Sequence, residues 1–173
     1  GVSFGTNNGT IYGTPTELWT QTSYMVWANN SGGSSVAYLN ITVVEELAII
    51  NILPSSATIT RGYDMADITA NNTGGDVSTW SISPALPLGL SLNNGTIHGR
   101  PLVNMSATTF TIYANNSGGS ATATLTLTIN EPTPNIEYNP DNHTLTNGTS
   151  YTITPTLLGQ TGDISSILSG GTV

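Results

Sequence analysis

A repeated segment is the feature of this sequence that most limits what the chain can fold into. Residues 7–43 align without a gap with residues 93–129, and each aligned pair is 86 positions apart. A weaker match at the same spacing relates Pro54 to Pro140. Self-similarity at a fixed period is typical of proteins built from one recurring structural unit. The 173 residues are therefore expected to form a row of modules rather than one large domain.

The positions at which the 86-residue repeat starts and stops along the chain predict three segments. Residues 1–44 carry the second half of a module, residues 45–131 a complete module, and residues 132–173 the first half of another. The opening GVSF corresponds to GLSL at Gly89–Leu92, which lies in the middle of the repeat. The two incomplete segments together hold the content of one repeat.

The hydrophobic pattern within the repeat has the period of a β-strand. In residues 121–129 the apolar residues alternate strictly with threonine, which places the two kinds of side chain on opposite faces. The preceding ANNSGGS supplies the glycines of a hairpin loop after a strand at 110–114. Further strands are expected near 48–53, 57–60, 65–70, 77–83, 90–92 and 96–99. No stretch longer than one turn has a helical pattern, so the sequence predicts an all-β, antiparallel β-sandwich.

Residues 79–129 carry a specific set of motifs. WSISPALPLGL is followed by NGTIHGRP and then by the ANNSGG hairpin, and the last two motifs recur in residues 10–43. This order resembles the He-PIG family of immunoglobulin-like repeats, which are related to cadherin-like modules. The resemblance implies tandem immunoglobulin-like β-sandwiches, a place in bacterial or archaeal surface proteins, and no catalytic residues. It also implies that Trp80 is a buried core residue; Ile167 stands at the corresponding place in the third segment, where no PALPLGL follows.

The composition argues against several classes of function. Only 7% of residues are charged, the net charge is −8, and two arginines are the only strong bases, so nucleic acid and anionic membranes are poor partners. No apolar run has the length of a membrane span. Cysteine and lysine are absent, and His98 is replaced by Tyr12 in the sister repeat. We therefore expect that the chain is not an enzyme and uses no cofactor.

Acidic residues near the module boundaries are a candidate calcium site. Calcium prefers six to eight oxygen ligands, several of them carboxylates, and the cadherin-like relatives bind it between modules. Solvated linker acids are the simpler interpretation, because the hairpins carry neutral asparagine where calcium-binding relatives often carry aspartate. The candidate ligands of a weak site are Glu45, Glu46, Asp64, Asp67, Asp76 and Glu131.

An aromatic face in the first segment is a candidate ligand site. If the predicted hairpin pairs symmetrically about its loop, Met25 lies opposite Tyr38 and Trp27 opposite Val36, all on the outer face. The sister repeat has mainly threonine there. Such a patch, with Tyr12, suits stacking on a sugar or packing on another protein. The alternative is that the rest of this module, or a neighbouring one, covers it.

Nine Asn-x-Ser/Thr sequences are candidate glycosylation sites, although Asn-Gly-Thr and Asn-Asn-Ser are also ordinary turn sequences. They begin at Asn8, Asn29, Asn40, Asn71, Asn94, Asn104, Asn115, Asn142 and Asn147.

These features predict a non-catalytic spacer or stalk in an extracellular surface protein, whose partners are neighbouring modules or copies of itself. An adhesin or lectin-like module that binds carbohydrate or protein through the aromatic face is the alternative. A third hypothesis is head-to-tail assembly, in which the half-modules of two chains complete each other. Truncation of a longer chain explains the same phase more simply.

Overall fold

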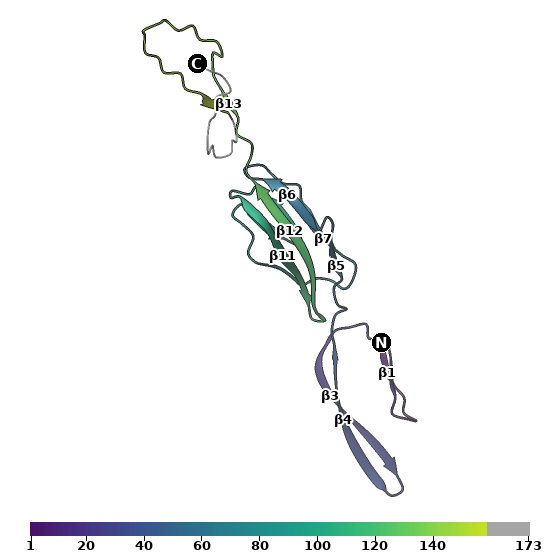
Figure 1. Cartoon of the computed structure of the whole chain (residues 1–173). Coiled ribbons are helices and arrows are strands. Elements are labelled where there is room, and N and C mark those ends of the chain that lie inside the picture. The colour runs from purple at the N-terminus through teal and green to yellow at the C-terminus, as the bar shows by residue number, and fades with distance from the viewer. Residues whose placement is uncertain (159–173) are drawn as a thin grey trace. The chain divides into compact units, whose positions relative to one another are not determined.

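The computed structural model describes residues 1–158, and every regular element in that part is a β-strand, which confirms the all-β prediction (Figure 1). The strands are β1 (Val2–Phe4), β2 (Ile11–Gly13), β3 (Trp19–Asn30), β4 (Gly33–Val43), β5 (Ile50–Ile52), β6 (Ser56–Thr60), β7 (Ile68–Asn72), β8 (Thr79–Ser83), β9 (Leu90–Asn93), β10 (Thr96–Gly99), β11 (Met105–Asn116), β12 (Gly119–Asn130), β13 (Ile136–Glu137) and β14 (Thr156–Leu157).

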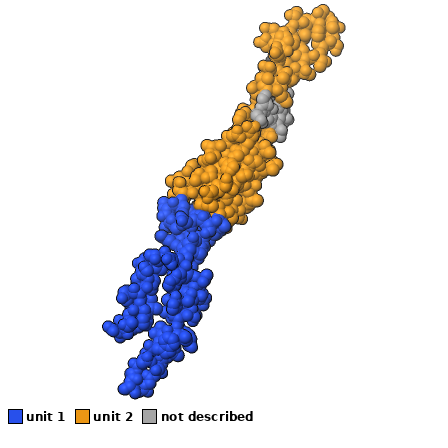
Figure 2. Space-filling model, turned by 180° about the vertical axis from the view of Figure 1, so that it is seen from behind, with its two compact units in different colours: residues 1–50, 72–79, 114–121 blue, residues 51–71, 80–113, 122–173 orange. Residues whose placement is uncertain are grey.

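The chain forms two compact units, which Figure 2 colours separately. One unit contains residues 1–50 together with residues 72–79 and 114–121. The other contains residues 51–71, 80–113 and the chain from 122 onward. The first unit thus includes two loop regions of the complete repeat as well as the whole first segment.

The complete repeat is an immunoglobulin-like β-sandwich of two four-stranded sheets. One sheet has the order β5-β7-β10-β9 and the other β6-β12-β11-β8 (Figure 1). The inward residues of β12 predicted from the alternation, among them Leu125, Leu127 and Ile129, are buried. They share the core with Phe110 and Ile112 of β11. Burial of these apolar faces is the main stabilising contribution to the module.

Two details differ from the prediction of an antiparallel sandwich with a buried tryptophan. β6 pairs parallel to β12, because the chain crosses from one sheet to the other between β5 and β6 and then runs in the same direction as β12. Trp80 is only half-buried, because β8 is an edge strand. A Cβ added at Gly95 would lie 2.9 Å from the indole of Trp80, so the ring covers that glycine.

The predicted strand at 65–70 begins later than expected. Residues 61–67 form a loop, and β7 starts at Ile68. The amide of Tyr63 donates a hydrogen bond to the carbonyl of Thr60, and the amide of Met65 donates one to Gly99. The turn at Tyr63 delays the strand, so Asp64 and Asp67 both lie in a loop.

The first segment consists of two hairpins. β1 pairs with β2, and β3 with β4, where Met25 lies opposite Tyr38 and Trp27 opposite Val36 as predicted. Their counterparts in the sandwich are β9–β10 and β11–β12. The register agrees with this correspondence, because Phe4 pairs with Ile11 as Leu92 pairs with Ile97. In the third segment, β13 pairs with β14 through two residue pairs.

Candidate functional site

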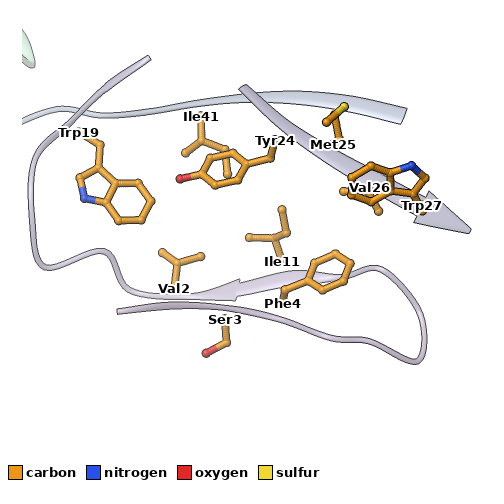
Figure 3. A pocket seen from close by; sticks show the side chains of 10 residues that line it. All are labelled: Val2, Ser3, Phe4, Ile11, Trp19, Tyr24, Met25, Val26, Trp27 and Ile41. Atoms are coloured by element: carbon orange, nitrogen blue, oxygen red, sulfur yellow. The ribbon is translucent and has the colours of Figure 1, made fainter. Parts of the chain in front are cut away.

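An apolar groove with a volume of about 360 Å³ lies between the two hairpins of the first unit (Figure 3). We call it the interhairpin groove. It is lined by Val2, Ser3, Phe4, Ile11, Trp19, Tyr24, Met25, Val26, Trp27 and Ile41.

The side chains of the two hairpins point toward one another across this groove. Figure 3 shows Val2 and Ile11 on one side and Trp19, Tyr24 and Ile41 on the other, with Ser3 turned away. The rings of Trp19 and Tyr24 stack with their centroids 6.4 Å apart. Because nearly all of this lining is hydrocarbon or aromatic, the groove suits burial of apolar side chains and offers no acid–base chemistry.

The predicted aromatic residues lie on two different surfaces. Met25, Trp27 and Tyr38 are exposed on the hairpin β3–β4, where Tyr38 is 70% exposed. Met25 and Trp27 also line the interhairpin groove, whereas Tyr38 does not. Tyr12 lies on β2 opposite Ser3, whereas its neighbour Ile11 faces the groove. The structure thus brings Met25 next to Tyr38 but places Tyr12 on the other hairpin, and binding at these residues stays a prediction.

The linker after β4 is fastened to the loop between β11 and β12. The amide of Glu45 donates to Oγ of Ser117 at 3.0 Å, and the amide of Ser117 donates to Oε2 of Glu45 at 2.9 Å. The Ser117 hydroxyl also donates to the same carboxylate oxygen at 3.1 Å. Nδ2 of Asn116 donates to the carbonyls of Glu46 (2.7 Å) and Asp76 (2.9 Å). We call this set of contacts the linker clasp.

The glycines of the same loop allow the linker to approach closely. A Cβ at Gly118 would collide with the carbonyl oxygen of Glu45. Gly119 has a φ of +139°, a conformation that non-glycine residues rarely adopt. The ANNSGG motif, interpreted from the sequence as a hairpin loop, is therefore also the binding surface for the linker.

The predicted calcium ligands are spread over several places. Glu131 forms an ion pair with Arg61 at 2.7 Å, and Asp64 pairs with Arg100 at 3.1 Å. Glu45 belongs to the linker clasp, to which Glu46 and Asp76 contribute backbone carbonyls. Asp67 is exposed in the loop before β7. Residues 1–158 contain no group of three or more acidic, histidine or cysteine side chains that could hold a metal, and calcium binding stays a prediction.

Local hydrogen bonds shift three ionisation equilibria. The guanidinium of Arg100 holds the pKa of Asp64 below its ordinary value by hydrogen bonding and by charge, and Asp64 in turn raises the pKa of Arg100. The pKa of Tyr151 is lowered by its hydrogen bond with Thr146. All three groups lie on the surface, so these shifts describe local pairing and not a tuned catalytic centre.

The remaining candidate residues lie mostly at the surface. His98 is half-buried on β10, and His143 is exposed in the third segment. Of the nine asparagines that begin glycosylation sequences, eight are exposed and Asn115 is half-buried. Asn94 has a φ of +44° and Gly95 one of +77°, so the predicted Asn-Gly turn is confirmed there. Whether any of the nine carries a glycan stays a prediction.

Trp19 of the interhairpin groove and Ser117 of the linker clasp were not predicted from the sequence. Alignment of the two repeats contains a signal for both residues. Trp19 corresponds to Met105, which packs against the core of the sandwich. Glu45 and Glu131 stand at equivalent positions, as do Ser31 and Ser117, which indicates a recurring pair at the junction.

Comparison with known sequences identifies the complete repeat. Residues 48–130 match the model of the He_PIG family, described as "Putative Ig domain". A similar relative is the serine-rich adhesin for platelets of Staphylococcus aureus (strain MRSA252), which is 27% identical over 128 residues. The match covers 72% of this chain but only 9% of the adhesin, so the chain spans less than a tenth of that protein.

Comparison with solved structures finds tandem extracellular domains. Extracellular domains 3–5 of Drosophila OTK align with a TM-score of 0.44 and 18% identity, covering 75% of this chain and 46% of that one. The four N-terminal Ig domains of Dscam1 isoform 1.9 align with a TM-score of 0.37 and 18% identity, covering 74% and 36%. Residues 1–158 contain no helix with the length and apolar character that a membrane crossing requires.

Proposed function

Because residues 48–130 match the model of the He_PIG family, described as "Putative Ig domain", we propose that this chain is a stiff structural spacer within an extracellular surface protein. The relation to a staphylococcal surface adhesin supports the extracellular location. The spacer role needs no active site, and it agrees with the dispersed placement of the ionisable residues. Neighbouring modules are then the main partners of each module.

The linker clasp is the observation that carries this proposal. A spacer holds neighbouring modules at fixed positions only if the linkers between its modules resist bending. A free linker of a few residues would bend readily. Here the linker backbone at Glu45 and Glu46 is hydrogen-bonded to Ser117 and Asn116 of the following module. The charged carboxylate of Glu45 receives two of these bonds, and hydrogen bonds to charged groups are stronger than neutral ones.

The test is to substitute Ser117→Ala and to measure ¹⁵N relaxation of the two flanking segments. In the unaltered chain, residues 1–43 and 48–130 should tumble with one rotational correlation time. The substitution removes the hydroxyl that accepts from Glu45 and donates to it, so the first segment should tumble faster than the sandwich. Ser31→Ala, at the equivalent loop position of β3–β4, is the matched control and should change nothing. Independent tumbling of the unaltered chain would contradict the spacer proposal.

Adhesion through the exposed aromatic residues of β3–β4 is the second candidate function. Met25, Trp27 and Tyr38 remain exposed there, and exposed aromatic clusters suit stacking on a sugar or packing on a protein. The test is binding to glycan and surface-protein arrays, with Trp27→Ala as the altered chain. Thr111→Ala, at the position of β11 that corresponds to Met25, is the control. Binding that Trp27→Ala abolishes is the expected result, and the absence of binding on both arrays would exclude this candidate.

Calcium at the junction is a further proposal that concerns the same clasp. The backbone carbonyls of Glu46 and Asp76 both accept from Asn116, and the Glu45 carboxylate accepts from the neighbouring Ser117. A calcium ion bound there would use carboxylate and carbonyl oxygens, which are its usual ligands. It would stiffen the same linker.

A further inference from the structure

A cavity of about 660 Å³ lies where the chain leaves the sandwich. Its walls are the end of β6, residues 63–66 of the loop that follows, and residues 130–133, where β12 passes into the linker. β6 and β12 pair in parallel, so Thr60 lies beside Asn130 and both strands end at this place (Figure 1). We call it the exit cavity. Its volume is within the range of about 300–1,000 Å³ that is typical of small-molecule sites.

The exit cavity combines an aromatic ring, carboxylates and hydroxyl groups. Tyr63 is 50% exposed, and the side chain of Asp64 is 76% exposed. The other polar groups of the lining are the side chains of Thr58, Thr60, Asn130, Glu131 and Thr133. A sugar has the complementary mixture, because the C–H groups on one face of its ring stack on an aromatic side chain while its hydroxyls form hydrogen bonds.

Both arginines of the chain hold carboxylates of this cavity. Nε and Nη2 of Arg100 donate to the two oxygens of Asp64, each at 3.1 Å, and Nη2 of Arg61 donates to Oε2 of Glu131 at 2.7 Å. A carboxylate has about four acceptor positions, so Asp64 can accept from a ligand while Arg100 holds it. Because each acid is balanced by a base, the cavity favours a neutral ligand over an ion.

The loop that carries Tyr63 is held in place without a ligand. The amide of Arg61 donates to the carbonyl of Asn130 at 2.9 Å, and the amide of Met65 donates to that of Gly99 at 3.0 Å. These two bonds tie the loop to the ends of β12 and β10. A site that is already formed loses less conformational entropy on binding, which favours affinity for a small ligand.

The aromatic and charged residues of the exit cavity are particular to the complete repeat. At the spacing of 86 residues, Tyr63 corresponds to Thr149 and Arg100 to Thr14. Asp64 corresponds to Ser150. The recurring backbone plan therefore does not require this set of side chains. Exposed ion pairs also contribute little to stability, so the pair at Asp64 is better explained by a role in binding.

We propose that the exit cavity binds a neutral carbohydrate, with Tyr63 stacking on one face of a sugar ring and Asp64 accepting hydrogen bonds from its hydroxyls. The threonine hydroxyls and the amide of Asn130 bind further hydroxyls of the sugar. The site is separate from the exposed aromatic residues of β3–β4. It goes beyond the spacer function, because it gives the complete module a ligand of its own.

The test is a ¹H–¹⁵N NMR titration of the whole chain with neutral disaccharides, namely lactose, maltose, cellobiose and N,N′-diacetylchitobiose. At least one of them should cause saturable shifts of the amides of residues 60–66 and of Asn130, Glu131 and Thr133. The anionic trisaccharide 3′-sialyllactose should bind no more tightly than the best neutral disaccharide.

Two pairs of variants separate a role in binding from a role in folding. Tyr63→Ala should raise the dissociation constant about tenfold, because the stacking surface is lost. Tyr63→Phe keeps the ring and should bind like the unaltered chain. Asp64→Asn should weaken binding several-fold, because one acceptor oxygen is replaced by a donor. Asp67→Asn, in the same loop but outside the cavity lining, should leave the dissociation constant unchanged.

The absence of saturable shifts with every disaccharide would overturn the proposal. So would binding that Tyr63→Ala and Asp64→Asn leave unchanged, or tighter binding of 3′-sialyllactose, which would indicate an anion site. Shifts that are centred on β3–β4 and abolished by Trp27→Ala would assign the binding to the other candidate surface and would also refute this one. None of these results depends on how the segments tumble, so failure of the carbohydrate site and failure of the spacer function are distinguishable.

Discussion

Ser117 illustrates how one side chain can connect two modules. Its hydroxyl accepts a hydrogen bond from the linker backbone and donates one to the Glu45 carboxylate, while its own amide donates to the same oxygen. Each bond contributes little alone, because folding exchanges it for bonds with water. Together they fix the linker at one place, so a residue typical of a turn sequence acquires a structural role.

The ion pair between Asp64 and Arg100 should make stability depend on pH. Both carboxylate oxygens accept from the guanidinium at 3.1 Å, which lowers the pKa of Asp64. A lowered pKa in the folded state stabilises the fold at neutral pH, and that contribution disappears as the pH falls through the lowered value. Asp64→Asn should therefore slightly lower the melting temperature at pH 7. The melting temperatures of the two chains should converge as the pH falls through the lowered pKa of Asp64.

Asp67→Asn is the control for this measurement, because Asp67 is exposed in the same loop. Thermal melts followed by circular dichroism between pH 2 and pH 7 would provide the comparison. A difference between Asp64→Asn and the unaltered chain that stays constant over this range would show that the ion pair is not its cause.

At the scale of elements, the two long hairpins show how one pattern gives two different environments. β4 and β12 share the alternation of apolar and polar residues, and the loops before them share the NNSGG motif. β12 lies between β6 and β11, whereas β4 has β3 as its one partner among the described strands. Strand neighbours, and the sheet that faces them, therefore decide whether the apolar side of the hairpin becomes a core.

This difference predicts that truncation of equivalent apolar residues in β12 and β4 lowers the free energy of unfolding by unequal amounts. Leu127→Ala should reduce the free energy of unfolding of the sandwich by about 2–5 kcal/mol, because it opens a cavity in a packed core. Ile41→Ala, at the equivalent position of β4, should reduce the free energy of unfolding by less, because Ile41 is only half-buried. Urea denaturation of chains carrying each substitution measures both. Equal losses would contradict the view that β3–β4 lacks the packing of a complete module.

At the scale of the whole molecule, the repeat and the units of compact structure differ. The first unit combines residues 1–50 with residues 72–79 and 114–121, because the linker is bonded to loops of the following module. Under the spacer proposal, junctions of this kind join neighbouring modules into one continuous structural element.

The strand periodicity, the Asn-Gly turn at Asn94 and the pairing of Met25 with Tyr38 could all be predicted from the sequence. Each depends on local backbone preference or on the alternation of neighbouring side chains, which a single segment already contains. The fixed period predicted one recurring unit, and the resemblance of the motifs to He-PIG repeats predicted that this unit is an immunoglobulin-like sandwich.

Only the tertiary structure decided how these elements meet. The parallel pairing of β6, the half-burial of Trp80 at an edge strand, and the loop around Asp64 depend on which strands become neighbours. The linker clasp joins residues 72 positions apart, and the interhairpin groove exists because two hairpins face each other. Periodicity assigns a side chain to a face of its strand, but the free energy of burial depends on what packs against that face, which is a property of the folded arrangement.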